Sequence, residues 1–227
     1  MKAILLSAGF GKRLMPYTSE MPKCLLPVKG KPLLEIWMDK LDNLGVQSFL
    51  INTHYMHSKV EDFVMQSKFK KKITLVYENQ LLGTGGTLCK NLKFYDNQDG
   101  FLIHTDNYCE DSLIDFKHCH INRSINCDIS MLLFRTDKPK QSGIAEINSN
   151  KILINFEEKP SEPKSNLANG AVFILSDIFI KQYKRNFEKS YDFSAEVIPK
   201  YLGRVMTYET KEKYLDIGTP DKYLSVR

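Results

Sequence analysis

The stretch that decides the fold reads KAILLSAGFGKR over residues 2–13. Its short apolar run at 3–6 is typical of a buried strand, and small residues follow that run at once. Small residues let backbone N–H groups approach an anion closely, and Lys12 and Arg13 add positive charge beside them. The stretch therefore predicts a phosphate-binding turn at the end of a first strand.

Neither of two common phosphate-binding patterns is complete in this turn. The dinucleotide-binding pattern GxGxxG needs a third glycine where Leu14 stands. The Walker A pattern needs Ser or Thr directly after Gly-Lys, where Arg13 stands. The turn on its own therefore does not choose one class of nucleotide-binding protein.

Apolar runs and amphipathic stretches alternate beyond the turn. Further buried strands are predicted at 49–52, 73–77, 101–105 and 129–134. Helices are predicted at 32–45, where Pro32 suits the first turn and Gly45 the cap, at 57–66, and from about residue 84. This alternation predicts an α/β fold, a doubly wound, mixed and mainly parallel sheet with right-handed crossovers.

After residue 135 the predicted strands become shorter, at 143–147, 152–156 and 171–175, and polar turns separate them. This change predicts a small, partly antiparallel region laid over the main sheet. Ligands of doubly wound sheets bind beyond the carboxyl ends of the strands, so the residues that follow each strand are the candidates for function.

Composition narrows the class of protein. The 227 residues are 42% hydrophobic and 26% charged, which excludes a disordered or collagen-like chain. No apolar run has the roughly 18 residues that a membrane-spanning helix needs, and no secretory signal is expected. Five cysteines without a CxxC pair indicate reduced thiols, so we predict a cytoplasmic protein. The net charge of +5 suits a polyanionic partner without identifying it.

The turn is the start of a longer pattern over residues 9–34: G-x-G-x-R-L-x-P-x-T-x3-P-K-x-L-L-P-V-x-G-K-P-L-L. This pattern closely resembles the signature of nucleotidyltransferases that join a nucleoside triphosphate to a sugar 1-phosphate. Later segments match in order, namely NTHY at 52–55, LGTGGT at 82–87, DN at 106–107, FEEKP at 156–160, NG at 169–170 and DIGTP at 216–220. The resemblance covers almost the whole chain. It implies one nucleotidyltransferase domain over 1–227, with a Rossmann-like sheet and a small antiparallel sugar-binding region.

The resemblance also implies an in-line attack of a sugar-phosphate oxygen on the α-phosphorus, with pyrophosphate leaving. Four residues would carry this chemistry. Arg13 and Lys23 would bind phosphate groups, and Asp106 and Asp216 would share a Mg²⁺ ion that bridges the phosphates. These two aspartates lie 110 residues apart, so their spacing alone does not show that they meet. The attacking oxygen is already anionic, so no general base is expected, and His54 is interpreted as a local hydrogen-bonding residue.

Two binding sets follow from the same resemblance. The nucleotide-binding set consists of Ser7, Ala8, Gly9, Gly11, Lys12, Arg13, Gln80, Gly83, Thr84 and Gly85. The sugar-phosphate-binding set consists of Asn107, Glu158, Lys159, Asn169 and Gly170. Lys12 departs from the small polar residue that is usual at its position, so its contact with the triphosphate is left open.

The implied partners are a nucleoside triphosphate and a sugar 1-phosphate, with no nucleic acid and no membrane, and a homo-oligomer is left open. The PKCLLP element at 22–27 and the GTGG turn look closer to guanylyl- and uridylyltransferases than to thymidylyltransferases. We expect GTP with mannose 1-phosphate, a heptose 1-phosphate or a related hexose 1-phosphate. The alternatives are a cytidylyl- or uridylyltransferase for another sugar or polyol phosphate, and a catalytically silent nucleotide-sugar-binding subunit.

Overall fold

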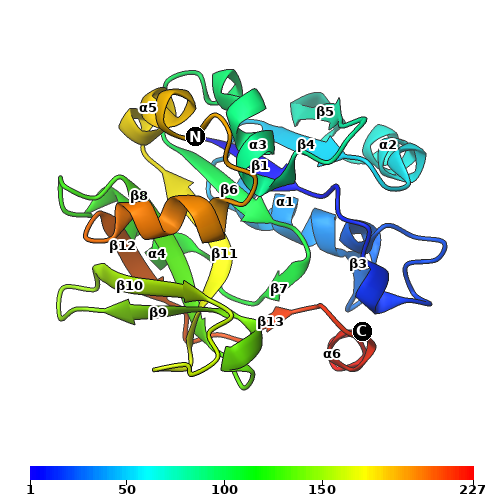
Figure 1. Ribbon diagram of the computed structural model, residues 1–227. Helices are drawn as coiled ribbons and strands as arrows, with labels where there is room; N and C mark the ends of the chain where they lie inside the picture. The colour runs from blue at the N-terminus through cyan, green and yellow to red at the C-terminus, as the bar shows by residue number, and fades with distance from the viewer.

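The computed structural model describes residues 1–227, and its centre is a nine-stranded sheet (Figure 1). The helices are α1 (Leu33–Asn43), α2 (His57–Gln66), α3 (Gly83–Lys90), α4 (Ile114–Ile121), α5 (Asp177–Phe187) and α6 (Pro220–Leu224). The strands are β1 (Lys2–Leu6), β2 (Pro27–Val28), β3 (Lys31–Pro32), β4 (Phe49–Thr53), β5 (Ile73–Tyr77), β6 (Gly100–His104), β7 (Asn107–Cys109), β8 (Ile129–Arg135), β9 (Gly143–Ile147), β10 (Leu153–Glu158), β11 (Leu167–Leu175), β12 (Val205–Glu209) and β13 (Tyr214–Asp216). Short helical turns include η1 (Lys12–Leu14), η2 (Lys23–Leu25) and η6 (Phe193–Val197).

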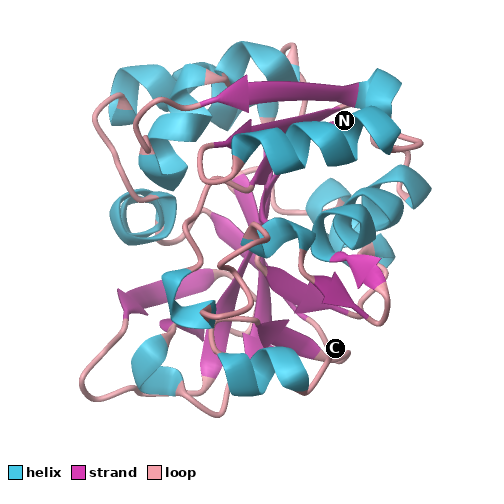
Figure 2. Cartoon of the chain, turned by 90° about the vertical axis from the view of Figure 1, so that its right-hand side faces the viewer, coloured by secondary structure: helices cyan, strands magenta, loops and turns pink.

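Strands β6, β1, β4 and β5 form the parallel half of the sheet. They read as continuous apolar runs because both of their faces are buried. Ala3 and Leu5 pack with α1 and α2 on one face, whereas Ile4 packs with α3 and α5 on the other. Figure 2 shows helices lying on both sides of the strands. The prediction of a doubly wound, mainly parallel sheet is confirmed.

Strand β11 joins the parallel half to the antiparallel half. Its first residues, 167–169, pair with β8 and β9, and its last residues, 172–175, pair with β6 and β8. The register shifts between Asn169 and Phe173, where the strand changes one of its partners. The predicted antiparallel strands exist, but they are not laid over the sheet. They continue its edge in the order β11-β9-β10, because β11 is long enough to pair with both halves.

A small antiparallel ribbon of β7 and β13 stands beside the main sheet (Figure 1). Next to it lies a third apolar cluster, in which residues of the 14–33 segment pack against residues of the 217–226 segment. Within it the ring of Tyr223 lies 5.0 Å from that of Tyr17, and its hydroxyl donates to the Pro27 carbonyl at 3.0 Å. The end of the chain therefore supports the turn that follows β1.

A buried polar chain links α4, β8 and the start of α5. His120 Nδ1 lies 2.8 Å from Ser130 Oγ, and its Nε2 lies 3.0 Å from Asp99 Oδ2. The other Asp99 oxygen accepts the Asp177 N–H at 2.8 Å. The order Ser-His-Asp is that of a hydrolase triad, but Ser130 and His120 are both fully buried. No substrate reaches them, so these hydrogen bonds have a structural role.

None of the six helices has the length and apolar character needed to cross a bilayer. The predicted helix positions agree with α1 and α2, and α3 begins one residue before the predicted start. Strand β11 begins at Leu167, four residues earlier than the predicted strand, because Asn169 and Gly170 lie within it rather than in a turn.

Candidate active site

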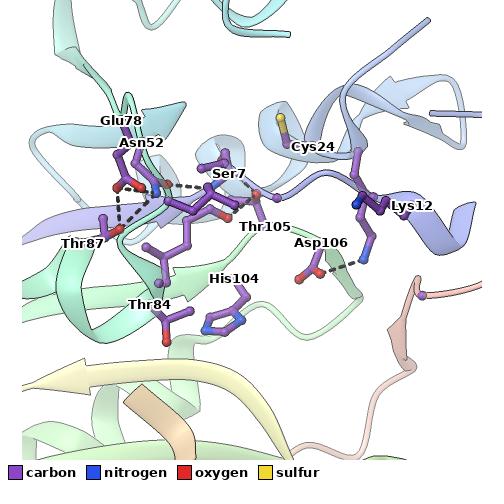
Figure 3. A pocket seen from close by; sticks show the side chains of 18 of the residues that line it. Ser7, Lys12, Cys24, Asn52, Glu78, Thr84, Thr87, His104, Thr105 and Asp106 are labelled. Carbon is purple, nitrogen blue, oxygen red and sulfur yellow. Dashed lines mark hydrogen bonds and ion pairs between the residues drawn. The ribbon is translucent and has the colours of Figure 1, made fainter. Parts of the chain in front are cut away.

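A cavity of about 410 Å³ opens at the carboxyl ends of β1, β4 and β6, where a doubly wound sheet places its ligands (Figure 3). Its walls come from segments that are distant in the sequence: 6–14, 23–24, 81–87, 104–106, 191–192 and Gly218. Of the predicted residues, the wall contains Ser7, Ala8, Gly9, Gly11, Lys12, Arg13, Lys23, Gly83, Thr84 and Asp106. The structure thus brings most of the predicted nucleotide-binding set to one cavity.

The turn after β1 has a conformation that requires glycine at position 11. Gly11 has a φ of 63°, and a Cβ there would lie 2.9 Å from Thr18 Cγ2. The Thr18 hydroxyl donates to the Gly11 carbonyl at 2.9 Å, which holds the turn closed. Arg13 and Lys12 are exposed at the cavity, and neither forms an ion pair with a protein carboxylate. Their charges are therefore available to an anion.

The floor of the cavity is a hydrogen-bonded network around Glu78, shown at the left of Figure 3. The Ser7 N–H donates to Asn52 Oδ1 at 2.8 Å, and Asn52 Nδ2 donates to Glu78 Oε1 at 3.0 Å. The Thr87 hydroxyl donates to the same Glu78 oxygen at 2.5 Å, and the Leu82 N–H donates to Glu78 Oε2 at 3.2 Å. This network fixes the ends of β1, β4 and β5 relative to α3. Sequence reasoning missed Glu78, because an acid after a strand commonly faces water.

The turn at 83–85 is covered by the segment 190–193. Gly83 has a φ of 72°, and a Cβ there would lie 2.3 Å from the Tyr191 carbonyl oxygen. The Gly85 N–H donates to that same carbonyl at 2.9 Å, and the Phe193 N–H donates to Thr84 Oγ1 at 2.7 Å. Gly83 and Thr84 line the cavity, whereas Gly85 and Gln80 do not. The predicted contacts of this turn with a base stay predictions.

Tyr191 and Asp192 are cavity residues that sequence reasoning missed. They lie more than a hundred residues beyond the turn that they cover, and no pattern in their own segment marks them. Only the packing of η6 against α3 brings them to the site.

The β7–β13 ribbon brings the two predicted acidic residues together. Asp216, the last residue of β13, is paired in register with Asn107, and Asp106 stands in the turn directly before Asn107. Lys23 Nζ lies 2.7 Å from Asp106 Oδ2. A Cβ on Gly218 would lie 3.2 Å from Asp216 Oδ2 and 3.5 Å from Arg13 Nη2. Arg13 and Lys23, the two cations predicted to bind phosphate, therefore lie close to the two acids; Asp106 lines the cavity, whereas Asp216 lies just outside its wall.

Burial acts to raise the pKa of Asp106, but the charge interactions with Lys23 and His104 and the hydrogen bonds to the carboxylate together outweigh burial, and the net pKa lies below the ordinary value. Asp106 is therefore ionised at neutral pH. Asp216 forms no ion pair within the protein, and no group of three or more His, Cys, Asp or Glu side chains is placed to hold a metal. Mg²⁺ commonly takes one or two carboxylates together with phosphate and water oxygens, so these two aspartates fit it.

Four of the predicted sugar-phosphate residues, Glu158, Lys159, Asn169 and Gly170, lie on the antiparallel side of the sheet. Asn107 lies in the β7–β13 ribbon, and all five lie outside the cavity wall. Removal of the Glu158 carboxyl group from water raises its pKa. The positive charge of Lys159 acts against this rise, and the negative charge of Asp192 adds to it. Asp192 itself lines the cavity, so the two regions adjoin there.

Other residues of this set hold the strands together. Asn107 Nδ2 donates to the Gly170 carbonyl at 3.3 Å, and the Tyr214 hydroxyl donates to the same oxygen. Asn169 Nδ2 donates to Ser194 Oγ at 3.0 Å, and its Oδ1 accepts the Ala171 N–H at 2.8 Å. The structure gives Asn107 and Asn169 a structural role, and their contacts with a sugar phosphate stay predictions.

A family model described as nucleotidyl transferase matches residues 2–227. The chain belongs to the nucleotidyl transferase family. This result confirms the family that the motifs predicted, and it covers both the phosphate turn and the β7–β13 ribbon.

Individual relatives are similar over nearly the whole chain. A protein of Sulfolobus acidocaldarius is 31% identical over 229 residues, which cover 99% of this chain and 61% of that protein. The D-glycero-alpha-D-manno-heptose 1-phosphate guanylyltransferase of Campylobacter jejuni is 28% identical, with 98% of this chain and 97% of the relative covered. The mannose-1-phosphate guanyltransferase of Schizosaccharomyces pombe is 25% identical, with 99% and 63% covered. The chain therefore spans about three fifths of some relatives and nearly all of others.

The crystal structure of HddC from Yersinia pseudotuberculosis complexed with GMP-PN has a similar fold. Its TM-score is 0.80 at 25% identity, and the match covers 99% of this chain and 97% of HddC.

Proposed function

We propose that this protein joins a nucleoside triphosphate, with GTP preferred, to a sugar 1-phosphate, forming a nucleotide sugar and pyrophosphate. The observation that carries the proposal is the β7–β13 ribbon. In this ribbon Asp216 pairs in register with Asn107, the residue after Asp106, while Lys23 holds Asp106 and Arg13 lies near Asp216. A protein that only bound nucleotide sugars has no evident need for two cations and two acids at one point.

The main task of the chain is to bring two anions together and hold them in line. Good alignment of reactants is worth roughly 7–11 kcal/mol, so residues that position the substrates can supply much of the catalysis. The turn at 8–13 binds the triphosphate through backbone N–H groups, and the Arg13 guanidinium offers two parallel donors to phosphate oxygens. Lys159 meets the phosphate of the sugar.

Lys23 stabilises the charge that develops at the α-phosphate. Its ammonium is nearly buried and is held by Asp106 at 2.7 Å, so it is already oriented before substrate binds. A fixed cation of this kind costs no reorganisation during the reaction. Asp106 and Asp216 would hold a Mg²⁺ ion, which would supply further neutralisation of phosphate charge.

Guanine and a mannose-like sugar are the favoured substrates. Two of the relatives above are named as guanylyl- or guanyltransferases, acting on a heptose 1-phosphate and on mannose 1-phosphate. HddC was solved with a guanine nucleotide analogue. These names support GTP with mannose 1-phosphate or a manno-heptose 1-phosphate.

A substrate panel tests the proposal. The purified chain would be incubated with GTP, UTP, CTP and dTTP, each combined with mannose, heptose, glucose and N-acetylglucosamine 1-phosphates, and pyrophosphate release would be measured with Mg²⁺ and with EDTA. We expect release with GTP and a manno-configured sugar, lost in EDTA and in Asp106→Asn. Tight GTP binding without turnover on any pair would instead identify a silent binding subunit.

A further inference from the structure

The imidazole of His104 is the one polar side chain in the cavity wall that contains a buried atom with no hydrogen-bond partner. His104 ends β6, and its side chain reaches the cavity, as Figure 3 shows. Its Nε2 is buried and unpartnered, and no protein group accepts from or donates to the other ring nitrogen. Buried polar atoms in native proteins are nearly always satisfied, so an unsatisfied one in a ligand cavity points to a partner that is absent from the chain itself.

The position of the ring indicates which part of a nucleotide it meets. His104 is paired in register with Leu6, just before the phosphate turn, and it stands two residues before Asp106. His104 lines the same cavity as Thr84, which belongs to the turn predicted to bind the base, and both are drawn in Figure 3. The base turn and the Lys23–Asp106 pair line this one cavity together with the ring, so the ring faces a ligand that extends from one to the other. In a nucleoside triphosphate, the group between the base and the α-phosphate is the ribose.

The chemistry of the ring suits that group. An imidazole offers one donor and one acceptor in either neutral tautomer, and a ribose hydroxyl both donates and accepts. No hydrogen bond fixes the ring, so a rotation about its Cβ–Cγ bond turns either nitrogen toward the cavity. Leu6, the wall residue paired with His104 in the sheet, is apolar and offers no side-chain bond to a hydroxyl.

We propose that His104 binds a ribose hydroxyl of the nucleoside triphosphate and makes the site select ribonucleotides over deoxyribonucleotides. The inference rests on the proposed function and names a specificity residue for it. A site with a polar group built to bond a hydroxyl rejects the analogue that lacks it, since the polar group is then left without a partner.

The test compares GTP with 2′-deoxy-GTP and 3′-deoxy-GTP in the wild type, His104→Leu and His104→Gln, by kcat/KM and by calorimetric Kd for the nucleotide alone. His118→Leu is the matched control, because His118 is an exposed histidine on α4 that does not line the cavity. We expect the wild type and the control to prefer GTP to at least one deoxy analogue by about tenfold or more. His104→Leu should lose that preference because it binds GTP more weakly while its binding of the deoxy analogue stays the same. His104→Gln should keep part of the preference.

Three results would overturn the inference. The first is a wild type that does not discriminate between GTP and either analogue. The second is an equal loss for GTP and the deoxy analogues in His104→Leu, which is the mark of a merely structural role. The third is a His104→Leu variant that keeps the wild-type nucleotide preference but discriminates differently between mannose 1-phosphate and its 2-deoxy analogue, because His104 would then contact the sugar and not the ribose. Absence of turnover in every variant would refute the proposed function, while the Kd ratios would still decide the role of His104.

Discussion

Replacing Gly83 by alanine is expected to destabilise the protein and to weaken nucleotide binding, whereas replacing Gly45 by alanine should only destabilise it slightly. The two glycines have nearly the same φ, 72° and 78°. A Cβ at Gly45 would meet nothing within 4 Å, so it isolates the cost of a left-handed residue, about 1–2 kcal/mol.

The cost at Gly83 is larger because a Cβ there would lie 2.3 Å from the Tyr191 carbonyl oxygen, which is backbone. The segment 190–193 must then move away from α3. That movement would weaken or break two hydrogen bonds, from the Gly85 N–H to the Tyr191 carbonyl and from the Phe193 N–H to the Thr84 hydroxyl. Each is worth about 0.5–1.5 kcal/mol, so the total loss for Gly83→Ala is about 2–5 kcal/mol.

Urea unfolding followed by circular dichroism would give the free energies of unfolding, and calorimetry would give the Kd for GTP. Gly45→Ala should bind GTP like the wild type, since Gly45 lies at the end of α1 and outside the cavity wall. If both variants lose the same free energy and both keep the wild-type Kd, then the 190–193 segment does not shape the cavity, and the reasoning fails.

Asp216→Asn should raise the Mg²⁺ concentration for half-maximal turnover by at least about tenfold, and an unchanged Mg²⁺ titration would exclude Asp216 as a ligand. Lys23→Ala should lower kcat by about 10²-fold with a smaller change in KM, as expected for a charge that acts in the transition state. Lys159→Ala should raise KM for the sugar 1-phosphate while KM for GTP stays constant, and an effect on both would place Lys159 elsewhere. Burial lowers the pKa of His120 in the folded protein below its usual 6.5. As pH drops through about 6.5, His120 is protonated in the unfolded chain but not in the folded one, so the free energy of unfolding decreases. The urea midpoint should therefore decrease between about pH 7 and pH 5, and less so in His120→Gln; parallel profiles would rule out His120 as a cause.

The sequence was informative where local patterns decide structure. Strand β1 and helix α1 were found because a strand buried on both faces and an amphipathic helix have distinct apolar spacing. The pairing of Asp106 with Asp216 could not be derived from spacing, because it depends on the register of β7 with β13. The resemblance supplied that pair, and the geometry then accounted for it.

Other features of the site escaped prediction for a related reason. Glu78 is buried by Asn52 and Thr87, which come from different elements, and its own neighbours in the sequence give no sign of that burial. The role of Thr84 in holding the Phe193 N–H likewise depends on η6, which folds back over α3 from far along the chain. Contacts between distant segments are decided by packing, and a single sequence does not contain a local pattern for them.

The order of the ribbon strands has a consequence for the chain as it leaves the ribosome. Strand β7 is synthesised long before β13, so the chain contains both Lys23 and Asp106 long before Asp216 is added. The second carboxylate is missing until residue 216 has been added. A partly translated chain therefore lacks both the second acid and the Tyr223 contacts that support the turn after β1, and the proposed chemistry begins only when translation has passed β13 and α6.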